Sequence, residues 1–251
     1  MELGIAGQRV LVTGGSQGLG RAAALAFARE GCRVAVVARS AERLAGLLEE
    51  LGGPGLGHAV LAMDLMPAGA PERALAALEG GGAFSIVLHN LGGTLGLREP
   101  LAPVAAWAEV WRLNVGIAIE LNDRLLPAMV TARAGRIIHV SSDAAQTGRG
   151  ATPYAAAKAY LNTYVKGLGR HFGPSGVVLS ALMPGPLETP GSTWETLRRE
   201  HPDRLEEYLR HHQSRGRLGS PEEVLPFLLF LASSQATYAA AAILGVDGGS
   251  L

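Results

Sequence analysis

Short aliphatic runs alternate with longer helical patterns along almost all of the 251-residue chain. Several of these runs are apolar at nearly every position, as expected for strands that are covered on both faces. Strands that alternate with helices form right-handed crossovers, which produce a parallel sheet with helices on both sides. The sequence therefore predicts an α/β fold with a doubly wound sheet of about seven strands. The expected strands are 9–12, 33–38, 58–62, 84–89, 136–141, 177–182 and 241–246, and the expected helices are 18–30, 40–51, 71–79, 103–131, 152–171 and 221–233.

The Gly- and Pro-rich segments between these elements are too short for interdomain linkers, so residues 1–251 are expected to form one domain. One segment, between residues 182 and 221, interrupts the alternation and contains Trp194, two helical patterns and many charges. Long insertions in compact domains commonly serve as lids or binding loops. We therefore expect a substrate-binding lid at about 187–216, with a solvated surface hairpin as the alternative.

Charge and cysteine content exclude several classes of protein. The chain has 22 basic and 22 acidic residues, so no basic surface for nucleic acid or anionic membrane is expected. The most apolar window, 225–232, is much shorter than the roughly 20 residues that span a membrane. The single cysteine, Cys32, can form neither an internal disulfide nor a Cys-based zinc site. We expect a soluble, cytoplasmic protein.

A glycine-rich turn follows the first expected strand and opens a helix. Gly14 permits a tight turn, Gly18 lets the backbone approach a phosphate, and Gly20 lets helix and strand pack closely. The free N–H groups at the helix N-terminus then face an anion. The pattern predicts a pyrophosphate site in a Rossmann-type fold; a simple strand–helix connection is the alternative reading.

The end of the second expected strand indicates which dinucleotide binds. An acid at this position suits the ribose 2′-hydroxyl of NAD, whereas an Arg suits the 2′-phosphate of NADP. The strand here ends in Arg39 and contains no acid, and a guanidinium can bind a phosphate through two hydrogen bonds. We expect NADP(H), with NAD(H) as the alternative. Asp64, after the third strand, could bind the adenine amino group or cap the turn at Met66.

Tyr154 and Lys158 lie four residues apart in an expected helix, so their side chains share one face. A cation near a phenol favours the phenolate, and such a phenol can exchange a proton with an alcohol or a carbonyl oxygen. Only two of the 22 basic residues, Lys158 and Lys166, are lysines. A compact ammonium able to reach both the tyrosine and ribose hydroxyls explains Lys158 in so Arg-rich a chain.

Two polar positions upstream complete a candidate catalytic group. The strand at 136–141 runs into Ser141 and Ser142, which places a hydroxyl at the carboxyl edge of the sheet where such folds bind ligands. Alignment by the strand selects Ser142, whereas counting back from the tyrosine selects Ser141; we favour Ser142. Asn114 lies within the expected helix 103–131, where Asn and the nearby Gly116 are unfavourable. This cost indicates a local hydrogen-bonding role for Asn114; a core amide bonded to its own backbone is the alternative.

Taken together, these motifs resemble the short-chain dehydrogenase/reductase family over essentially the whole chain. The resemblance rests on the glycine motif, on the strand end from His89 to Gly92, on the Tyr–Lys pair, on the turn at Pro184 and Gly185, and on the closing patterns 217–223 and 246–249. It implies a catalytic tetrad of Asn114, Ser142, Tyr154 and Lys158. It also implies that the cofactor is bound by Gly14, Ser16, Gln17, Gly18, Leu19, Gly20, Arg39, Asp64, Leu65, Asn90, Gly92, Tyr154, Lys158, Pro184, Gly185, Leu187 and Thr189.

His89 and Leu91 depart from the family's usual Asn and Ala, at a position that steadies the central strand and the adenine pocket. Cofactor affinity is therefore expected to differ from that of relatives with the usual residues.

The resemblance implies hydride transfer between NADP(H) and a carbonyl or secondary alcohol. A 3-oxoacyl thioester ranks first as substrate by analogy, and a small ketone or sugar ranks second. A non-catalytic dinucleotide sensor or scaffold, and non-reductive chemistry on a retained cofactor, are the alternatives. Family members are often homotetramers, so a homotetramer or homodimer is expected through the helices 103–131 and 152–171.

Substrate contacts are expected from residues around the carboxyl edge and from the insertion. The adjacent His211 and His212 would point about 100° apart on a helix, which favours solvated charge over a metal site. The candidate substrate positions are Gly93, Thr94, Asp143, Thr152 and the segment 187–215 with Trp194, Tyr208, His211 and His212.

Overall fold

The computed structural model describes residues 2–250 and contains a seven-stranded parallel sheet with the order β3-β2-β1-β4-β5-β6-β7. This confirms the predicted doubly wound α/β fold, because the strand order reverses between β1 and β4. All six strand pairings are parallel, for example Val12 with Val36 and Ile138 with Ser180. The strands are β1 (Arg9–Thr13), β2 (Arg33–Ala38), β3 (Ala59–Ala62), β4 (Ile86–His89), β5 (Gly135–Val140), β6 (Val177–Pro184) and β7 (Ile243–Val246).

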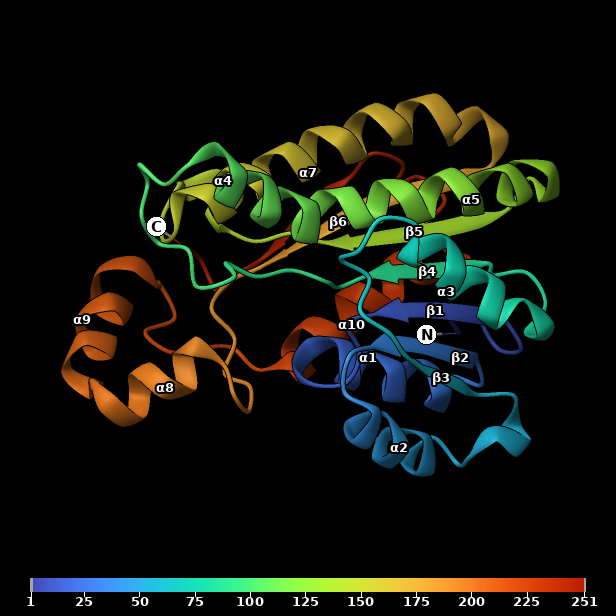
Figure 1. Cartoon of the computed structure of the whole chain (residues 1–251), viewed down its shortest axis with the longest axis horizontal. Helices are drawn as coiled ribbons and strands as arrows, with labels where there is room; N and C mark the ends of the chain where they lie inside the picture. The colour runs from blue at the N-terminus through green and yellow to red at the C-terminus, as the bar shows by residue number, and fades with distance from the viewer. Residues whose placement is uncertain (1, 251) are drawn as a thin grey trace.

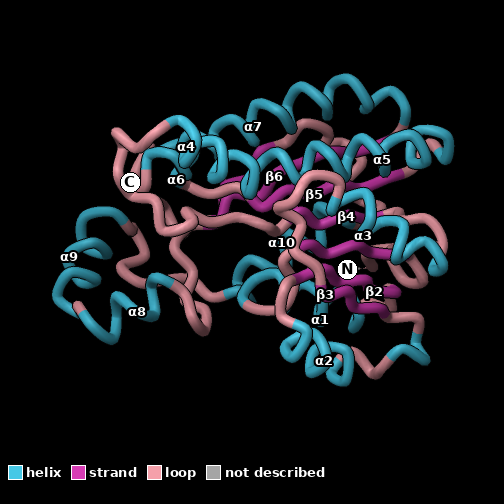
Figure 2. Tube along the Cα trace, in the orientation of Figure 1, coloured by secondary structure: helices cyan, strands magenta, loops and turns pink. Residues whose placement is uncertain are grey.

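Helices cover both faces of the sheet, as Figures 1 and 2 show. Successive strand residues point to opposite faces, so Val10 and Val12 pack with α1, α2 and α10, whereas Leu11 packs with α3 and α5. This explains why the strands are apolar at nearly every position. The helices are α1 (Gly18–Arg29), α2 (Ala41–Glu50), α3 (Ala70–Leu78), α4 (Val104–Trp111), α5 (Ile117–Ala132), α6 (Ala144–Thr147), α7 (Thr152–Phe172), α8 (Thr193–Glu200), α9 (Pro202–His212) and α10 (Pro221–Ala232). None of the described helices is long and apolar enough to cross a membrane.

The helix expected over 103–131 is the main difference from the sequence prediction. It is divided by a π turn at Arg112–Gly116, which separates α4 from α5. Asn114 is at the centre of this turn, and its side-chain amide donates a hydrogen bond to the carbonyl oxygen of Val110 at 2.8 Å. The amide is buried and bonded to its own helix at Val110, as one interpretation predicts, and it also bonds to Gly93 outside the helix, as the other predicts. π turns of this kind are frequent at functional sites.

The insertion after β6 contains α8 and α9, which extend beyond the sheet on the side of its carboxyl edge (Figure 1). Its far end is tied to the C-terminal segment. The amide groups of Ser214 and Arg215 donate to the carbonyl oxygens of Gly249 and Gly248 at 3.0 and 3.2 Å. The C-terminal end of the insertion, at Ser214 and Arg215, is thus held in place by these hydrogen bonds.

A buried polar network joins four elements in the middle of the molecule. His89 Nε2 on β4 lies 2.8 Å from Asn122 Oδ1 on α5. The amide nitrogen of Asn122 lies 3.3 Å from Nε2 of His139 on β5 and donates to the Tyr164 hydroxyl on α7 at 3.0 Å. The two imidazole rings are stacked with centroids 4.7 Å apart. His89, which departs from the family pattern, therefore belongs to a network that connects β4 and β5 to the helices α5 and α7.

Burial keeps both imidazoles uncharged. It lowers the pKa of His89 to about 4, although the hydrogen bond to Asn122 raises this pKa in part. It also lowers the pKa of His139 well below its usual value, and the neighbouring His89 acts in the same direction. Two adjacent neutral rings can be buried without the cost of a charge.

We expect the free energy of unfolding to fall as the pH decreases from 6.5 towards 4, because protonation of His89 favours the unfolded chain. The contribution of His89 is fully present above its unfolded pKa of 6.5 and is lost as the pH falls through its folded pKa; it amounts to about 3 kcal/mol. Urea denaturation followed by circular dichroism across this range measures the effect. The variant His89→Asn should show a shallower pH dependence, whereas the exposed control His201→Asn should follow the wild type. Equal slopes for His89→Asn and the wild type would contradict the assignment.

Candidate active site

The glycine-rich turn forms a cradle between β1 and α1. Gly14 and Gly18 have positive φ angles of 69° and 56°, which favour glycine. A Cβ atom at Gly20 would lie 2.6 Å from the carbonyl oxygen of Gly14, so a side chain there would fill the turn. The N-cap residue of α1, Gln17, makes no side-chain hydrogen bond to the first amides of the helix. These amides are available to an anion, and the cradle fits a pyrophosphate.

The cradle is fixed to the neighbouring strand by Asn90. Its backbone amide donates to Thr13 Oγ1 at 3.2 Å, and its side-chain amide donates to the carbonyl oxygen of Gly14 at 2.9 Å. Asn90 therefore positions the turn from the end of β4.

A cleft of about 700 Å³ opens beside the cradle, and its lining includes Ser16, Gln17, Gly18, Arg43 and Thr189. The structure thus brings the predicted Thr189 to the glycine turn: a Cβ atom on Gly18 would be 3.5 Å from Thr189 Oγ1. Leu19 is buried at the start of α1 behind the cradle.

Two arginines lie near the end of β2, and the structure places them differently. Arg39 is exposed and is not part of the cleft lining. Arg43 lines the cleft and donates a hydrogen bond to Gln17 Oε1. Arg43 was not predicted from the sequence, because it is one of twenty arginines and only its contact with Gln17 distinguishes it. Ser40 between them caps α2 by accepting from the Arg43 amide at 3.3 Å.

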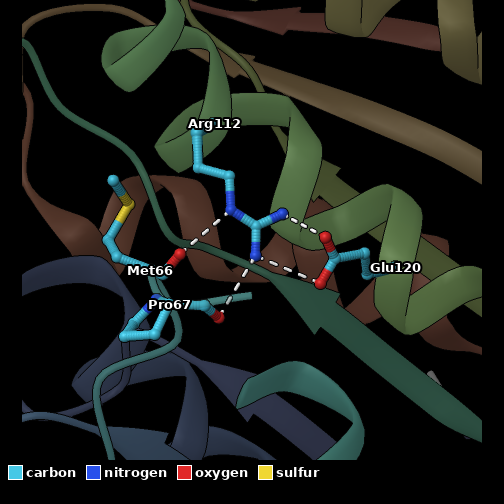
Figure 3. A network of polar contacts seen from close by, with 4 residues as sticks. All are labelled: Met66, Pro67, Arg112 and Glu120. Carbon is cyan, nitrogen blue, oxygen red and sulfur yellow. Dashed lines mark hydrogen bonds and ion pairs between the residues drawn. The ribbon is translucent and has the colours of Figure 1, made fainter. Parts of the chain in front are cut away.

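Asp64 and Leu65, both predicted to bind the cofactor, lie in the loop after β3. The carboxylate of Asp64 accepts from the Met66 amide at 3.0 Å, so the capping contact is present, and Leu65 is buried. Arg112 of the π turn holds this loop: its Nε donates to the Met66 carbonyl oxygen at 3.1 Å, and its guanidinium pairs with Glu120 on α5 (Figure 3). The predicted adenine loop and the turn that presents Asn114 are therefore connected through one side chain.

The buried ammonium of Lys158 lies at the carboxyl edge of β5. Lys158 Nζ donates to the carbonyl oxygen of Val140 at 2.7 Å, and it lies 5.6 Å from the centroid of the Tyr154 ring on the same face of α7. Burial lowers the pKa of Lys158 to about 7. Its proton is therefore held only weakly near neutral pH.

Gly92 and Asn114 converge on the same ammonium. A Cβ atom on Gly92 would lie 2.9 Å from both Asn114 Oδ1 and Lys158 Nζ. Asn114 is held against the Gly93 backbone, since its Oδ1 accepts from the Gly93 amide at 3.1 Å and its Nδ2 donates to the Gly93 carbonyl oxygen at 2.8 Å. Only glycine at position 92 leaves room for this arrangement.

The two candidate serines occupy different environments. Ser141 is buried, and its hydroxyl donates to the backbone carbonyl oxygen of Lys158 at 3.5 Å. Ser142 donates to Asp143 Oδ1 at 3.1 Å, accepts from the Ala144 amide at 3.2 Å, and lies close enough to the Tyr154 phenol to lower its pKa. Burial raises the pKa of Tyr154, the Ser142 hydroxyl lowers it in part, and the Asp143 carboxylate raises it. The geometry favours Ser142 over Ser141.

The predicted turn after β6 closes the other side of the site. A Cβ atom on Gly185 would lie 2.9 Å from the Cα atom of Asp247, so glycine is needed between Pro184 and the end of β7. Leu187 pairs with Gly219 in an isolated parallel bridge. This contact fixes the start of the insertion.

Aromatic side chains of the insertion pack on one another. Trp194 on α8 and Tyr208 on α9 have ring centroids 4.7 Å apart, and Tyr208 and His212 have centroids 5.2 Å apart. The Nδ1 atom of His212 lies 3.2 Å from Nη1 of Arg149, a residue that the sequence analysis did not select. Arg149 lies between two glycines in the loop from Ser142 to Tyr154, and nothing in that local pattern marked it.

Three comparisons place these features among known proteins. A family model described as enoyl-(acyl carrier protein) reductase matches residues 14–250. The chain is 33% identical to the 3-oxoacyl-[acyl-carrier-protein] reductase of Pseudomonas aeruginosa, with 98% of each chain covered. It is 28% identical to a subunit of (2S)-[(R)-hydroxy(phenyl)methyl]succinyl-CoA dehydrogenase of Thauera aromatica, again over 98% of each chain.

Among solved structures, L-sorbose reductase from Gluconobacter frateurii in complex with NADPH and L-sorbose is similar to the chain with a TM-score of 0.90 and 30% identity. The match covers 100% of this chain and 99% of that one. The fold, the glycine cradle, the Tyr–Lys pair and these matches agree, and the chain belongs to the short-chain dehydrogenase/reductase family of NAD(P)-dependent oxidoreductases.

Proposed function

We propose that this protein is an NADP(H)-dependent reductase in which Tyr154, Ser142, Lys158 and Asn114 act on a carbonyl substrate. The observation that carries the proposal is the placement of the buried Lys158 ammonium 5.6 Å from the Tyr154 ring and against the Val140 carbonyl oxygen, where β5 runs into Ser142. The adjacent cleft and the amides of the glycine turn provide a site for the dinucleotide.

Ser142 and Tyr154 have different roles in the proposed reduction. Bound NADPH supplies a hydride to the carbonyl carbon. Ser142 donates a hydrogen bond that orients the carbonyl oxygen, and Tyr154 transfers its phenolic proton to this oxygen as negative charge develops there. Because Ser142 donates to Asp143 in the structure, its hydroxyl hydrogen must turn from the carboxylate to the substrate.

Lys158 offsets the effect of burial on the tyrosine. Burial raises the pKa of Tyr154, which disfavours the phenolate that forms during the reaction. A protonated ammonium at this distance favours the phenolate, so the charged form of Lys158 supports proton transfer. Asn114 holds Gly93 and shapes the turn beside Lys158, which keeps the ammonium in place.

A 3-oxoacyl thioester is the first substrate class that we propose, because the Pseudomonas aeruginosa relative carries that activity in its name. A small polar ketone or sugar is the second candidate. It is supported by the sorbose reductase relative and by the polar contacts beside Ser142, where Ser250 donates to Asp143 Oδ2 at 2.6 Å.

We also propose that α8 and α9, within the segment 187–216, act as a lid over this site in a single-domain enzyme, and that the enzyme is cytoplasmic. A homotetramer or homodimer is supported by exposed aromatic residues on the helices expected to pair. Trp111 on α4 and Tyr160 on α7 are 37% and 49% exposed and pack edge to face.

We expect Tyr154→Phe to bind NADPH nearly as well as the wild type but to lower kcat by at least about 100-fold, because the proton donor is removed. Fluorescence titration with NADPH and its consumption with a panel of 3-oxoacyl thioesters, ketones and sugars measure the two effects. Unchanged turnover in Tyr154→Phe would exclude this residue as the acid. Tight NADPH binding by the wild type without turnover of any substrate would instead indicate a dinucleotide sensor.

The Lys158 pKa of about 7 predicts a pH dependence. As the pH rises through 7, the free enzyme loses the ammonium charge, so kcat/KM for NADPH in the reductive direction should fall. Initial rates between pH 6 and 9 give the profile. The exposed Lys166, two turns further along α7, provides the control: Lys166→Met should keep the same inflection. A flat wild-type profile across this range would contradict the role of Lys158.

Arg39 lies outside the lining of the cleft but directly follows β2, and on that position it is proposed as the partner of the 2′-phosphate. Arg39→Asp should lower kcat/KM for NADPH by about 10- to 100-fold through loss of a charge-assisted contact and should leave NADH less affected. Steady-state rates with each cofactor test this, with the exposed Arg170→Asp at the far end of α7 as a control. If the ratio of NADPH to NADH efficiency is the same in Arg39→Asp and the wild type, Arg39 is not the selecting residue.

A further inference from the structure

Arg149 lies on the loop that joins two proposed catalytic residues, seven positions after Ser142 and five before Tyr154. Its Nη1 atom is 3.2 Å from Nδ1 of His212 at the end of α9. The side chain therefore bridges the catalytic loop and the proposed lid. Since a guanidinium only donates, Nδ1 of His212 is the acceptor in this contact.

The remaining nitrogens of Arg149 are buried without partners. Among residues 2–250, neither Nε nor Nη2 makes a hydrogen bond, and no described acidic side chain forms an ion pair with Arg149. A guanidinium remains charged at all ordinary pH values, and leaving its N–H groups buried and unbonded is costly. A bound anion would satisfy these two donors.

The geometry of the guanidinium defines the kind of anion. The Nε–H and Nη2–H bonds lie along one edge of the planar group, and this edge matches the two oxygens of a carboxylate. His212 holds the opposite end through Nη1 and so orients the free edge. Arg149 can therefore bind a carboxylate through two parallel hydrogen bonds.

Hydrogen-bonded residues connect Arg149 to the proposed catalytic residues. His212, which holds Arg149, is followed by Gln213, whose side chain donates to Ser250, and Ser250 donates to Asp143 Oδ2. Asp143 in turn is hydrogen-bonded to Ser142 and influences the pKa of Tyr154.

The nearby acid does not neutralise the arginine. Asp143 Oδ1 accepts from Ser142, and its Oδ2 accepts from Ser250, which itself accepts from Gln213 at 2.7 Å. Both carboxylate oxygens thus accept from serines, and neither forms an ion pair with Arg149. A second carboxylate, brought by the substrate, would complete the site.

We propose that Arg149 binds a carboxylate of the substrate, so that the enzyme acts on oxo acids, including acyl compounds that carry a free carboxylate. His212 acts as a positioning residue for Arg149. The inference rests on the proposed reductase function, and among the carbonyl compounds proposed above it favours those that carry a free carboxylate.

Matched oxo acids and their methyl esters test the inference. With 2-, 4- and 5-oxo acids of up to six carbons, NADPH consumption by the wild type should give a kcat/KM for at least one acid that exceeds its ester by about 10- to 100-fold. Arg149→Met should lower the value for that acid to the level of the ester and leave the ester unchanged. The exposed Arg204→Met on α9 should behave as the wild type. His212→Phe should raise KM for the acid more than for the ester.

Equal use of acids and esters by the wild type, or an equal loss for both in Arg149→Met, would overturn the inference. A binding measurement separates this outcome from failure of the reductase proposal. Trp194 packs on Tyr208 beside His212, so its fluorescence in the NADP⁺ complex should change on binding of the acid. Saturable binding of an acid but not its ester, lost in Arg149→Met, would support the carboxylate site even if no ketone were reduced. No difference in binding between acid and ester would overturn it.

Discussion

The ammonium of Lys158 is enclosed where the strands β4 and β5 end, and several neighbouring features follow from the need to hold it there. A buried lysine requires an acceptor, which the Val140 carbonyl oxygen provides, and it requires space, which only a glycine at position 92 leaves. Asn114 reaches the same point because the π turn projects its side chain toward Gly93. The π turn between α4 and α5 and the glycine at position 92 are therefore both needed for the arrangement around the Lys158 ammonium.

The catalytic edge is connected to distant parts of the protein by polar side chains. Arg112 joins the π turn to the loop after β3, and the network of His89, Asn122, His139 and Tyr164 joins the central strands to α5 and α7. Buried polar groups of this kind are costly unless each one is bonded, and they favour one packing arrangement over its alternatives. Their directional hydrogen bonds fix the relative positions of these elements, which the non-directional contacts of the aliphatic core cannot do.

Much of this fold could be predicted from the sequence because its signals are local and periodic. Apolar strands, the glycine turn before α1 and the four-residue spacing of Tyr154 and Lys158 all depend on neighbours in the chain. The π turn could not be predicted, because residues 103–131 keep a helical pattern and only the unfavourable Asn114 indicated an irregularity. Arg43 and Arg149 were missed for a different reason. Each is one arginine among twenty, and its importance depends on tertiary contacts with Gln17 or His212 that leave no local pattern.

The attachment of the insertion limits how it can move. Ser214 and Arg215 are hydrogen-bonded to Gly249 and Gly248, and the next residue of that tail, Ser250, is bonded to the carboxylate beside Ser142. The second end of the insertion is therefore held beside Ser142, and the Leu187–Gly219 bridge holds its start. If α8 and α9 act as the proposed lid, they would turn about these two fixed ends and change access to the substrate while Ser142 and Asp143 keep their positions.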